Sequence, residues 1–489
     1  MQCRPSKEDA ARYRGEGYDV MPVSAELFAD VATPIETLKV FREQSDRSYL
    51  FESIEGGERW ARYSFLGFDP KAEVYVLDGK VYVTQDGRTE MTETRDPNGV
   101  LRGILSRYRS PKIGYLPTFT GGFVGYFAYE YYKYAEKIDL PGGEFGDARL
   151  LLFDKVAAYD NMRHKIVLIA NMRLDGDLDA EYGRAVEELA RMRSLILAGC
   201  KTKTVGARVT KPFEMAFTKE EYMEKVQKAR RYTYEGDIFQ CVPSNMWTAE
   251  IEGGLLNTYR MLRTINPSPY MIYMDMGDTE IAGASPETLV KLTDGRVTTF
   301  PIAGTRPRGK TREEDLALEE GLLKDAKEIA EHNMLVDLGR NDLGKICRFG
   351  TVRVDDYMKV YRFSHVMHIT STVTGEIVEG KDALDALSAT LPAGTLSGAP
   401  KKRAVEIIHE LEEGQVRGIY GGAVGYMDFM GNGDFCIAIR TATRKGKKVY
   451  VRAGGGIVEA SVPENEYLET CNKSAAVREA IARSGEVDQ

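Results

Sequence analysis

The sequence predicts an α+β protein built on antiparallel β-sheets. Apolar runs typical of strands, among them FVGYFAYEYY, RLLLFDKVAAYD and HKIVLIAN, precede a helical segment at 177–199. Farther along, turn-forming triplets at 293–295 and 445–447 divide β-rich blocks as hairpin turns do, and hairpins pair strands antiparallel. At 489 residues the chain exceeds what one hydrophobic core usually organises, so two domains or two intertwined lobes are expected.

The predicted domain boundary follows this helix, which is expected to end at Gly199. The next stretch, CKTKTVGARVTKPF, has few apolar residues and no clear period, as is typical of linkers. We therefore predict a linker at 199–211, with a boundary near residue 212 between an N-terminal lobe, 1–211, and a second domain, 212–489. The first helix of the second domain is expected to begin at the sequence TKEE, whose threonine and second glutamate form a capping-box pattern.

Composition excludes several classes of protein. Hydrophobic residues make up 43% of the chain and charged residues 29%, as in ordinary globular proteins. The formal charge of −8 provides no positive field for nucleic acid, and the polar N-terminus contains no apolar run long enough for a signal peptide or a membrane span. The six cysteines form no C-x-x-C pair, which argues against a zinc site or a disulfide scaffold. We therefore expect a cytoplasmic protein with no nucleic-acid or membrane partner.

Two predicted helices carry acidic residues where a core face is expected. Glu328 and Glu331 share one helix face with two leucines. Glu466 and Glu469 repeat this spacing and are followed on the same face by Lys473. Four carboxylates on two helices could bind a hard divalent ion, for which Mg²⁺ is the natural candidate. Alternatively, both faces are solvated and Glu469 pairs with Lys473 along its helix.

A series of longer motifs occurs in one order along the second domain. In this combination the chain resembles the chorismate-binding domain shared by anthranilate, aminodeoxychorismate, isochorismate and salicylate synthases. The resemblance implies two stacked antiparallel β-sheets flanked by helices, with the active site between the sheets and an intertwined N-terminal regulatory lobe. The motifs are ASPE (284–287), PIAGTRPRG (301–309), EHNMLVDLGRNDLG (331–344), SHVMH (364–368), AGTLSGAPK (393–401), YGGAVGY (420–426), AIRTA (438–442) and AGGGIVEASVPENEYLETCNK (453–473).

The resemblance also implies the metal ligands and the catalytic groups. Glu331 and Glu469 match Mg²⁺ ligands of the family, and Glu328 and Glu466 match acids that act directly or through waters. His368 matches the group that assists departure of the ring hydroxyl, and Glu287 and Thr305 match residues near that reaction.

The implied substrate contacts come from several motifs. The arginine of AIRTA matches a position that binds a carboxylate of chorismate, which a guanidinium can hold through two parallel hydrogen bonds. The glycines of AGGG would offer backbone N–H groups at close approach. The predicted substrate-binding residues are Gly304, Thr305, Tyr420, Arg440, Gly454, Gly455, Gly456 and Lys473.

Ala303 distinguishes two branches of the family. Aminodeoxychorismate synthases usually carry a lysine here, which acts as a nucleophile at C2 of chorismate. Alanine offers no nucleophile, so ammonia itself would add at C2, as in anthranilate synthases. Isochorismate and salicylate synthases need a lysine base in a different pattern and lack this N-terminal half.

Two further segments resemble the tryptophan pocket of anthranilate synthases. FESIEGGERWARYSFLG (51–67) resembles their LLES…GRYSFIG block, and NPSPYM (266–271) resembles the second half of the pocket. Aminodeoxychorismate synthases can retain related blocks, so this evidence is weaker than Ala303. The predicted tryptophan-binding residues are Glu52, Ser53, Asn266, Pro267, Tyr270 and Met271.

Together these resemblances imply the Mg²⁺-dependent large subunit of anthranilate synthase, a lyase of tryptophan biosynthesis. It would convert chorismate and ammonia to anthranilate and pyruvate and would be inhibited by tryptophan. The cysteines lack the Gly-rich turn of a glutaminase nucleophile, so a separate glutaminase subunit is expected to supply the ammonia. The alternatives are an aminodeoxychorismate synthase large subunit and, from another class, a non-catalytic sensor of chorismate or tryptophan.

Overall fold

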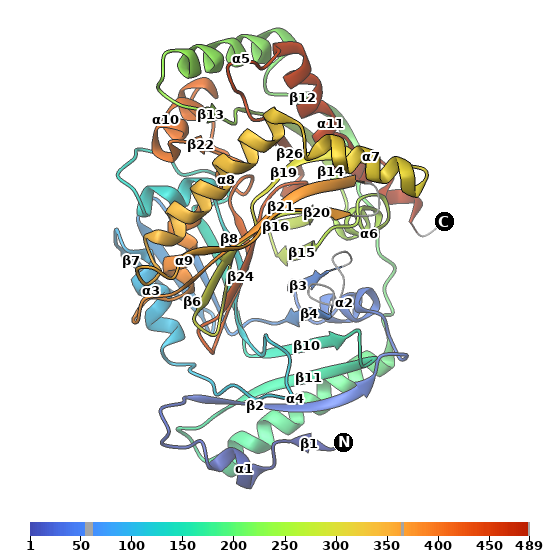
Figure 1. The fold of residues 1–489 in the computed structure, drawn as a ribbon. Coiled ribbons are helices and arrows are strands. Elements are labelled where there is room, and N and C mark those ends of the chain that lie inside the picture. The colour runs from blue at the N-terminus through green and yellow to red at the C-terminus, as the bar shows by residue number, and fades with distance from the viewer. Residues whose placement is uncertain (54–61, 363–365, 488–489) are drawn as a thin grey trace.

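The computed structural model describes residues 1–53, 62–362 and 366–487, and two large antiparallel sheets form its centre (Figure 1). The first sheet has twelve strands. In their order across the sheet they are β1 (Cys3–Arg4), β2 (Val20–Phe28), β11 (Lys165–Arg173), β10 (Lys155–Asp160), β4 (Tyr63–Phe68), β3 (Arg47–Glu52), β15 (Tyr270–Met276), β16 (Thr279–Ser285), β25 (Thr441–Lys445), β26 (Lys448–Gly454), β14 (Ser244–Glu252) and β12 (Arg208–Met215).

The second sheet also has twelve strands, and a separate two-stranded ribbon joins β13 (Gln240–Cys241) to β22 (Gly398–Ala399). Strand β20 (Arg353–Arg362) pairs only with β21 and lies off the main order. That order is β19 (Ile302–Pro307), β21 (Val366–Glu376), β18 (Arg296–Thr299), β17 (Thr288–Thr293), β24 (Gly433–Ile437), β23 (Ala423–Asp428), β8 (Gly122–Phe127), β9 (Ala148–Phe153), β5 (Ala72–Leu77), β6 (Lys80–Gln85) and β7 (Arg88–Glu93).

The two sheets pack face to face. Side chains of both sheets form the apolar core between them, among them Met274 of β15 and Val124 of β8. Side chains along β15 alternate between two cores, because successive residues of a strand point to opposite faces. Met274 faces the core between the sheets, whereas Met271 and Tyr273 belong to the core on the outer face of the first sheet. The predicted α+β fold with two stacked antiparallel sheets is confirmed.

Helices and short 3₁₀ segments complete the fold and cover the outer faces of the sheets. The capping box predicted at Thr218 and Glu221 is present in α5, and the helix predicted to end at Gly199 is α4. The helical elements are α1 (Lys7–Ala11), α2 (Pro34–Arg42), α3 (Pro97–Leu105), η2 (Tyr129–Tyr134), α4 (Leu178–Ala198), α5 (Lys219–Tyr234), α6 (Leu256–Ile265), α7 (Arg312–Leu322), α8 (Ala326–Gly344), α9 (Ala383–Thr390), α10 (Lys401–Leu411), α11 (Pro463–Ala482) and η3 (Ser484–Glu486).

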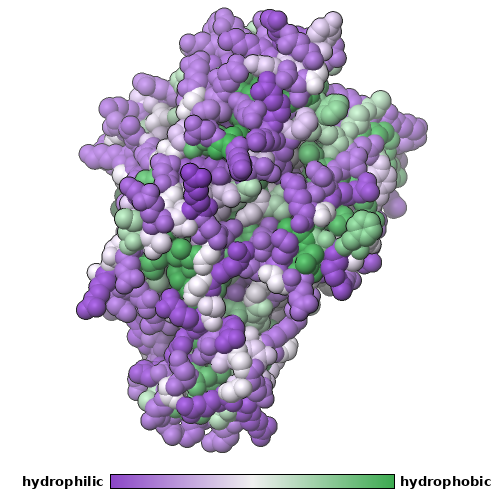
Figure 2. Space-filling model, turned by 90° about the vertical axis from the view of Figure 1, so that its left-hand side faces the viewer, coloured by the Kyte–Doolittle hydropathy of each residue, from purple (hydrophilic) through white to green (hydrophobic). Residues whose placement is uncertain are grey.

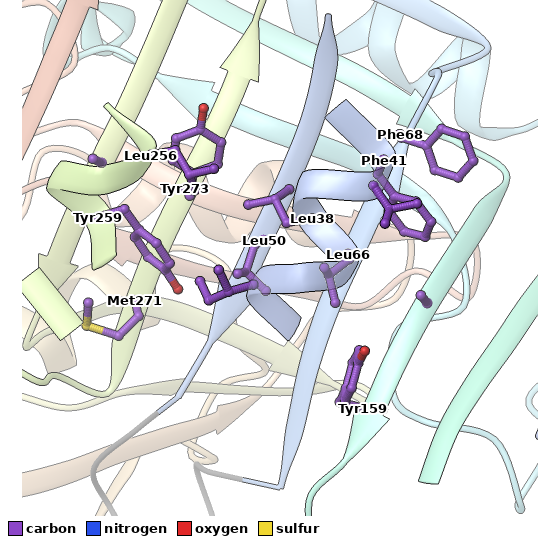
Figure 3. Close-up of a cluster of buried hydrophobic side chains, with 14 of the residues drawn as sticks. Leu38, Phe41, Leu50, Leu66, Phe68, Tyr159, Leu256, Tyr259, Met271 and Tyr273 are labelled. Atoms are coloured by element: carbon purple, nitrogen blue, oxygen red, sulfur yellow. The ribbon is translucent and has the colours of Figure 1, made fainter. Parts of the chain in front are cut away.

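The outer core of the first sheet joins both halves of the chain. Figure 3 shows Leu38 and Phe41 of α2 beside Leu50 of β3, with Tyr259 of α6 and Met271 of β15 in the same cluster. All five side chains are fully buried. Residues from before and after the predicted boundary therefore form one continuous core.

The two halves of the chain also share their strands. β3 pairs with β15 in the first sheet, and β8 pairs with β23 in the second. The predicted intertwining is therefore present. The predicted linker at 199–211 is wrong in its last part, because β12 begins at Arg208 and pairs with β14. Its polar sequence reflects an edge strand, which is mostly exposed and needs little apolar content.

Two apolar runs predicted as strands are divided by the tertiary structure. RLLLFDKVAAYD forms β9 and β10, which lie in different sheets on either side of Asp154. FVGYFAYEYY continues β8 only as far as Phe127, and its last three tyrosines then lie in the 3₁₀ segment η2. Apolar content marks both segments as buried, but it does not fix their direction or their hydrogen bonding.

In Figure 2 hydrophilic residues cover most of one face, and the hydrophobic patches between them are small. None of the helices in the described ranges is both long enough and apolar enough to cross a membrane.

Candidate active site

Helices α8 and α11 position the four predicted metal-binding glutamates. Helix α8 packs against β19 and β21, and α11 packs along β26. The carboxylate of Asp325 caps α8 by accepting from the backbone N–H groups of Lys327, at 3.0 Å, and Glu328, at 3.3 Å. This cap fixes the first turn of α8, which carries Glu328 and leads to Glu331.

The acidic side chains of α8 and α11 are close enough for the charge of one to shift the pKa of another. Burial raises the pKa of Glu331, and the nearby charges of Glu328 and Glu469 raise it further. Burial also raises the pKa of Glu466, with a further contribution from Glu469. Lys327 and Lys473 partly offset these effects. The acids of α8 and α11 therefore repel one another across a common space.

The alternative interpretation, in which the acidic faces are solvated, fits one of the four acids, Glu469. Lys473 forms the expected ion pair with Glu469, with 2.6 Å between Nζ and Oε1, and the Glu469 side chain is 48% exposed. Glu466, in contrast, is 7% exposed, and Glu328 and Glu331 are half-buried. Solvation alone does not account for three sheltered carboxylates of like charge.

The donor set fits a hard divalent cation. Within residues 1–53, 62–362 and 366–487, no three acidic, histidine or cysteine side chains lie close enough together to enclose a metal ion. Mg²⁺ does not require such a cage, because it keeps several waters and is commonly bound by one or two carboxylates. A cation beside Glu331 and Glu469 would also relieve the repulsion that raises the pKa of Glu331.

The end of β26 and the residues after it, 454–456, lie next to these acids, and we call this segment the glycine floor. A Cβ atom at Gly455 would lie 3.1 Å from Oε2 of Glu466 and 3.7 Å from Oε1 of Glu469. At Gly456 it would lie 2.6 Å from Nε2 of Gln240. The carbonyl of Gly454 accepts a hydrogen bond of 3.1 Å from Nζ of Lys473. Side chains on these glycines would therefore fill the space beside the carboxylates.

Arg440 lies near the glycine floor, and its backbone conformation is strained. Its φ of 54° lies in the left-handed region, which costs about 1–3 kcal/mol for a residue with a side chain and is often found at functional sites. Its guanidinium donates to the carbonyl of Lys473 at 2.6 Å. Burial lowers the pKa of Arg440, although Tyr420 and Glu469 partly offset this. A sheltered guanidinium of this kind favours an anionic ligand.

His368 and Thr305 are paired across two strands. They face each other in the register of β19 and β21, and Oγ1 of Thr305 lies 3.0 Å from Nδ1 of His368. The same Nδ1 lies 3.1 Å from the carbonyl of Gly304. Gly304 has a φ of +67°, and a Cβ there would lie 3.3 Å from Oε2 of Glu328. This pair is thus close to the acids of α8.

Burial also sets the protonation of two candidate proton-transfer groups. It lowers the pKa of His368, which the carbonyl of Gly304 partly offsets and Arg440 reinforces. Burial raises the pKa of Glu287 to about 8, although Thr395 and Lys473 partly offset it. Near pH 7 His368 is therefore mainly neutral, and Glu287 is mainly a protonated acid that can donate a hydrogen bond.

The predicted tryptophan-binding residues gather around the paired ends of β3 and β15. Glu52 pairs with Met271, and its carboxylate contacts Tyr259 and Arg263 of α6. Tyr270 points to the other face of the sheet, where its hydroxyl donates to Asp434 at 2.8 Å. The side chains of Tyr270 and Met271 therefore do not face one pocket.

The remaining positions of this group border the same strand ends. Asn266 ends α6, Pro267 follows it, and Ser53 follows β3. The middle of the predicted block, 54–61, lies outside the described residues, as do the first two residues of SHVMH.

The structure adds three residues that the sequence did not single out. Thr395 donates to Oε1 of Glu287 at 3.2 Å, and both residues line a small cavity of about 50 Å³. The positive charge of Lys327 lowers the pKa of Glu331 in α8 and of Glu466 in α11. Gln240 is buried beside Gly456. Thr395 lies within the quoted AGTLSGAPK motif, whereas nothing in the local sequence marks Lys327 or Gln240.

Comparison with known proteins gives consistent matches over nearly the whole chain. The family model of chorismate binding enzymes matches residues 47–479. Anthranilate synthase component 1 of Acetivibrio thermocellus is 45% identical, covering 98% of this chain and 99% of that protein. The Pseudomonas aeruginosa protein of the same name is 44% identical, covering 98% of both chains. A crystal structure of anthranilate synthase component I from Streptococcus pneumoniae has a TM-score of 0.75 and 36% identity, covering 92% of this chain and 99% of that one.

Proposed function

Because the chain belongs to the chorismate binding enzymes, we propose that it converts chorismate and ammonia to anthranilate and pyruvate. The observation that carries this proposal is the near-complete match to proteins named anthranilate synthase component 1. Ala303 supports the same branch, since this buried position opposite Ile369 offers no amine that could attack C2 of the substrate.

The cations of the site would hold the two carboxylates of chorismate. The Arg440 guanidinium donates to the backbone carbonyl of Lys473, and the Lys473 ammonium donates to the carbonyl of Gly454. Tyr420 is buried, and its hydroxyl would add a hydrogen-bond donor because burial raises its pKa to about 12. The N–H groups of Gly455 and Gly456 would contact a bound carboxylate where no side chain obstructs it.

His368, Thr305 and Glu287 would carry the proton transfers. Ammonia adds at C2, the C4 hydroxyl leaves as water, and loss of the C2 proton with the enolpyruvyl group then gives anthranilate and pyruvate. The leaving hydroxyl needs a proton, which a neutral acid such as Glu287 can supply. The neutral imidazole of His368, oriented through Nδ1 by Gly304 and Thr305, can accept or relay a proton at its other nitrogen.

Mg²⁺ is the cofactor that we propose for the four carboxylates. Glu331 and Glu469 would bind it, and Glu328 and Glu466 would contribute directly or through waters. When bound, the ion supplies Lewis acidity and positive charge that a substrate carboxylate can share.

Product analysis tests the proposed function. Purified chain, chorismate, Mg²⁺ and an ammonium salt are expected to yield anthranilate and pyruvate in equal amounts. An aminated product that retains its enolpyruvyl group would assign an aminodeoxychorismate synthase instead. Tight chorismate binding with neither product would assign the sensor.

A separate glutaminase subunit is the partner that we propose. Hydrolysis of glutamine requires an activated nucleophile, usually a cysteine thiolate. Burial raises the pKa of Cys241 and of Cys436 to about 12, so neither is a thiolate at neutral pH.

All six cysteines are free thiols, which supports a reducing cytoplasm as the location.

Nitrogen-donor specificity tests this partner. The isolated chain, supplied with chorismate, Mg²⁺ and glutamine but no ammonium, is expected to form no anthranilate. Addition of a glutaminase subunit should restore product, with one glutamate formed per anthranilate. Sustained anthranilate and glutamate formation by the chain alone would contradict the two-subunit proposal.

Tryptophan is the inhibitor that we propose for the paired ends of β3 and β15. The strand pairing offers a short connection to the active site. Met271 is opposite Ala284 in β16, and the N–H of Ala284 donates to the carbonyl of Arg440 at 3.1 Å. A ligand that shifts β15 could therefore alter the strained backbone at Arg440, provided that it binds two states of the protein with different affinity.

Substitution of Ser53 by leucine tests the inhibitor site. Half-maximal inhibition is expected to require at least about tenfold more tryptophan, because loss of a contact worth about 1.4 kcal/mol weakens binding tenfold. The uninhibited kcat should stay within about twofold of the unmodified value, a change of about 0.4 kcal/mol. Ser45→Leu, which precedes the opposite end of β3, is the matched control and should leave inhibition unchanged. An unchanged tryptophan response in the Ser53 variant would exclude this pocket.

A further inference from the structure

A fully buried ion cluster lies outside the residues assigned to substrate or metal. It consists of Glu412, at the C-terminal end of α10, with Arg417 and Arg452. The Arg417 guanidinium donates from Nε to Oε2 of Glu412 at 3.0 Å and from a second nitrogen to Oε1. Burial alone would raise the pKa of Glu412, but Arg417 and Arg452 hold it below its ordinary value. The cluster is therefore charged inside the protein.

The hydrogen bonds of Arg417 go to segments that carry the active site. One nitrogen donates to the carbonyl of Leu396 at 2.8 Å, and another donates to the carbonyl of Val242 at 2.6 Å. Leu396 follows Thr395, the residue that donates to Glu287. The Arg417 guanidinium therefore fixes the backbone next to a candidate catalytic group.

The same guanidinium also supports the substrate-binding tyrosine. Arg417 lies only three residues before Tyr420, and its Cζ is 5.8 Å from the centre of that ring. A cation at this range is attracted by the ring, and the interaction strengthens where water is excluded. The chain between them turns at Gly418, whose φ is +64°. Arg417 thus restrains both the ring of Tyr420 and the loop that carries it.

Glu412 extends the cluster to the glycine floor. Its Oε1 accepts from the backbone N–H of Ser244 at 2.7 Å and from the Ser244 hydroxyl at 2.8 Å. Ser244 is paired with Gly454 in the register of β14 and β26. The pair Glu412–Arg417 therefore joins the three segments that hold Tyr420, Thr395 and Gly454.

Glu130 completes the cluster from the N-terminal half of the chain. Its carboxylate accepts from the backbone N–H of Arg417 at 2.7 Å and from that of Gly418 at 3.0 Å. Glu130 lies in η2, the segment in which an apolar run departs from β8. This contact explains why a carboxylate is placed in the middle of a buried tyrosine-rich segment.

We propose that Arg417, Glu412 and Glu130 are positioning residues, which hold the substrate-contacting segments within residues 212–489 in one arrangement. The proposal rests on the proposed function, because it concerns the binding of chorismate at Tyr420 and Gly454. None of the three residues needs to touch the substrate. Arg417 acts through Tyr420 and Leu396, Glu412 acts through Ser244, and Glu130 acts through the loop backbone.

The planar guanidinium is essential to this arrangement. It makes four hydrogen bonds in fixed directions, to Glu412, Leu396 and Val242. A lysine at 417 keeps the positive charge but has three donors and no planar fork. Arg417→Lys is therefore expected to lower kcat/KM for chorismate by on the order of 100-fold, as misplacement of reacting groups by about 1 Å can do. KM for chorismate should rise, because Tyr420 and Gly454 would contact the substrate in the proposed function.

A matched control separates positioning from general stability. Arg149 in β9 is also buried, and it donates to Glu73 at 2.6 Å and to the Met276 carbonyl at 2.8 Å, at the end of β15 away from Met271. Arg149→Lys should lower the melting temperature in a similar way and leave KM for chorismate unchanged. A purely structural role of Arg417 would reduce the amount of active protein without changing KM.

A third variant keeps the test decisive if Arg417→Lys fails to fold. Glu130→Gln preserves shape and leaves Arg417 in place, and it too should raise KM for chorismate, because its amide group cannot accept from both backbone N–H groups. An unchanged KM in folded Glu130→Gln, or in folded Arg417→Lys, would overturn the proposal. All variants are compared with the unmodified chain, whose failure to form anthranilate would instead contradict the proposed function.

Discussion

Replacement of Glu331 or of Glu469 by glutamine is expected to lower kcat by at least about 100-fold at saturating chorismate and Mg²⁺. Changes in residues that only support the metal ligands typically cost about 10- to 100-fold in activity, and loss of a ligand itself should cost more. Each change removes one negative charge from the space between α8 and α11. The fold should persist. At Glu331, burial and the negative charges of neighbouring acids raise the pKa, so a neutral amide there removes charge repulsion. Steady-state assays and thermal melting measure the two effects separately.

The controls for this prediction lie on the same helices. Asp337 of α8 and Glu479 of α11 are exposed; Asp337 pairs with an arginine of its own helix, and Glu479 pairs with the arginine that caps α11. Asp337→Asn and Glu479→Gln should leave kcat and KM unchanged. Near-normal activity in both Glu331→Gln and Glu469→Gln would show that the two acidic faces are solvated and bind no required metal.

Replacement of His368 by alanine is expected to lower kcat by about 10²- to 10⁴-fold, the usual contribution of a positioned general acid or base. The ring is held by Thr305 and Gly304 at Nδ1, so its other nitrogen has a defined direction. Since burial lowers its pKa below the ordinary value, His368 is neutral at pH 7 and becomes charged only under more acidic conditions. An acidic limb of the kcat profile below about pH 6.5 should therefore be present in the unmodified chain and lost in the variant.

His409 is the matched control for His368. It lies in the last turn of α10 and belongs to none of the predicted site residues. His409→Ala should keep both kcat and its pH dependence. If His368→Ala retains more than about a tenth of the parental kcat, the proton transfers do not depend on this imidazole, and Glu287 becomes the principal candidate.

Much of the fold class could be predicted from the sequence, because the relevant signals are local. Hairpin triplets predicted antiparallel pairing, and the TKEE pattern predicted the start of α5, which the capping box of Thr218 and Glu221 confirms. Gly199 ends α4 as predicted, since glycine tolerates the positive φ of 70° found there. The spacing of Glu328 and Glu331 likewise predicted a shared helix face, because helical periodicity fixes which residues point the same way.

The candidate site depended more on ordered motifs than on single residues. One histidine or one glycine triplet has several ordinary explanations, whereas eight motifs in sequence indicated one family. Thr305 and His368 are 63 residues apart in the chain, and only the register of β19 and β21 brings them within 3.0 Å. The motifs could identify these residues but could not show that they touch.

The sequence by itself determined the α+β class, the helix ends and the residue types of the site, because each depends on neighbours within a few positions. The tertiary structure alone decided the rest. It divided RLLLFDKVAAYD between two sheets, made an edge strand of the polar segment at 208–215, and brought Glu130 to Arg417 across 287 residues of chain. It also raised the pKa of Glu287 to about 8, because desolvation depends on everything packed around a group and not on its neighbours in sequence.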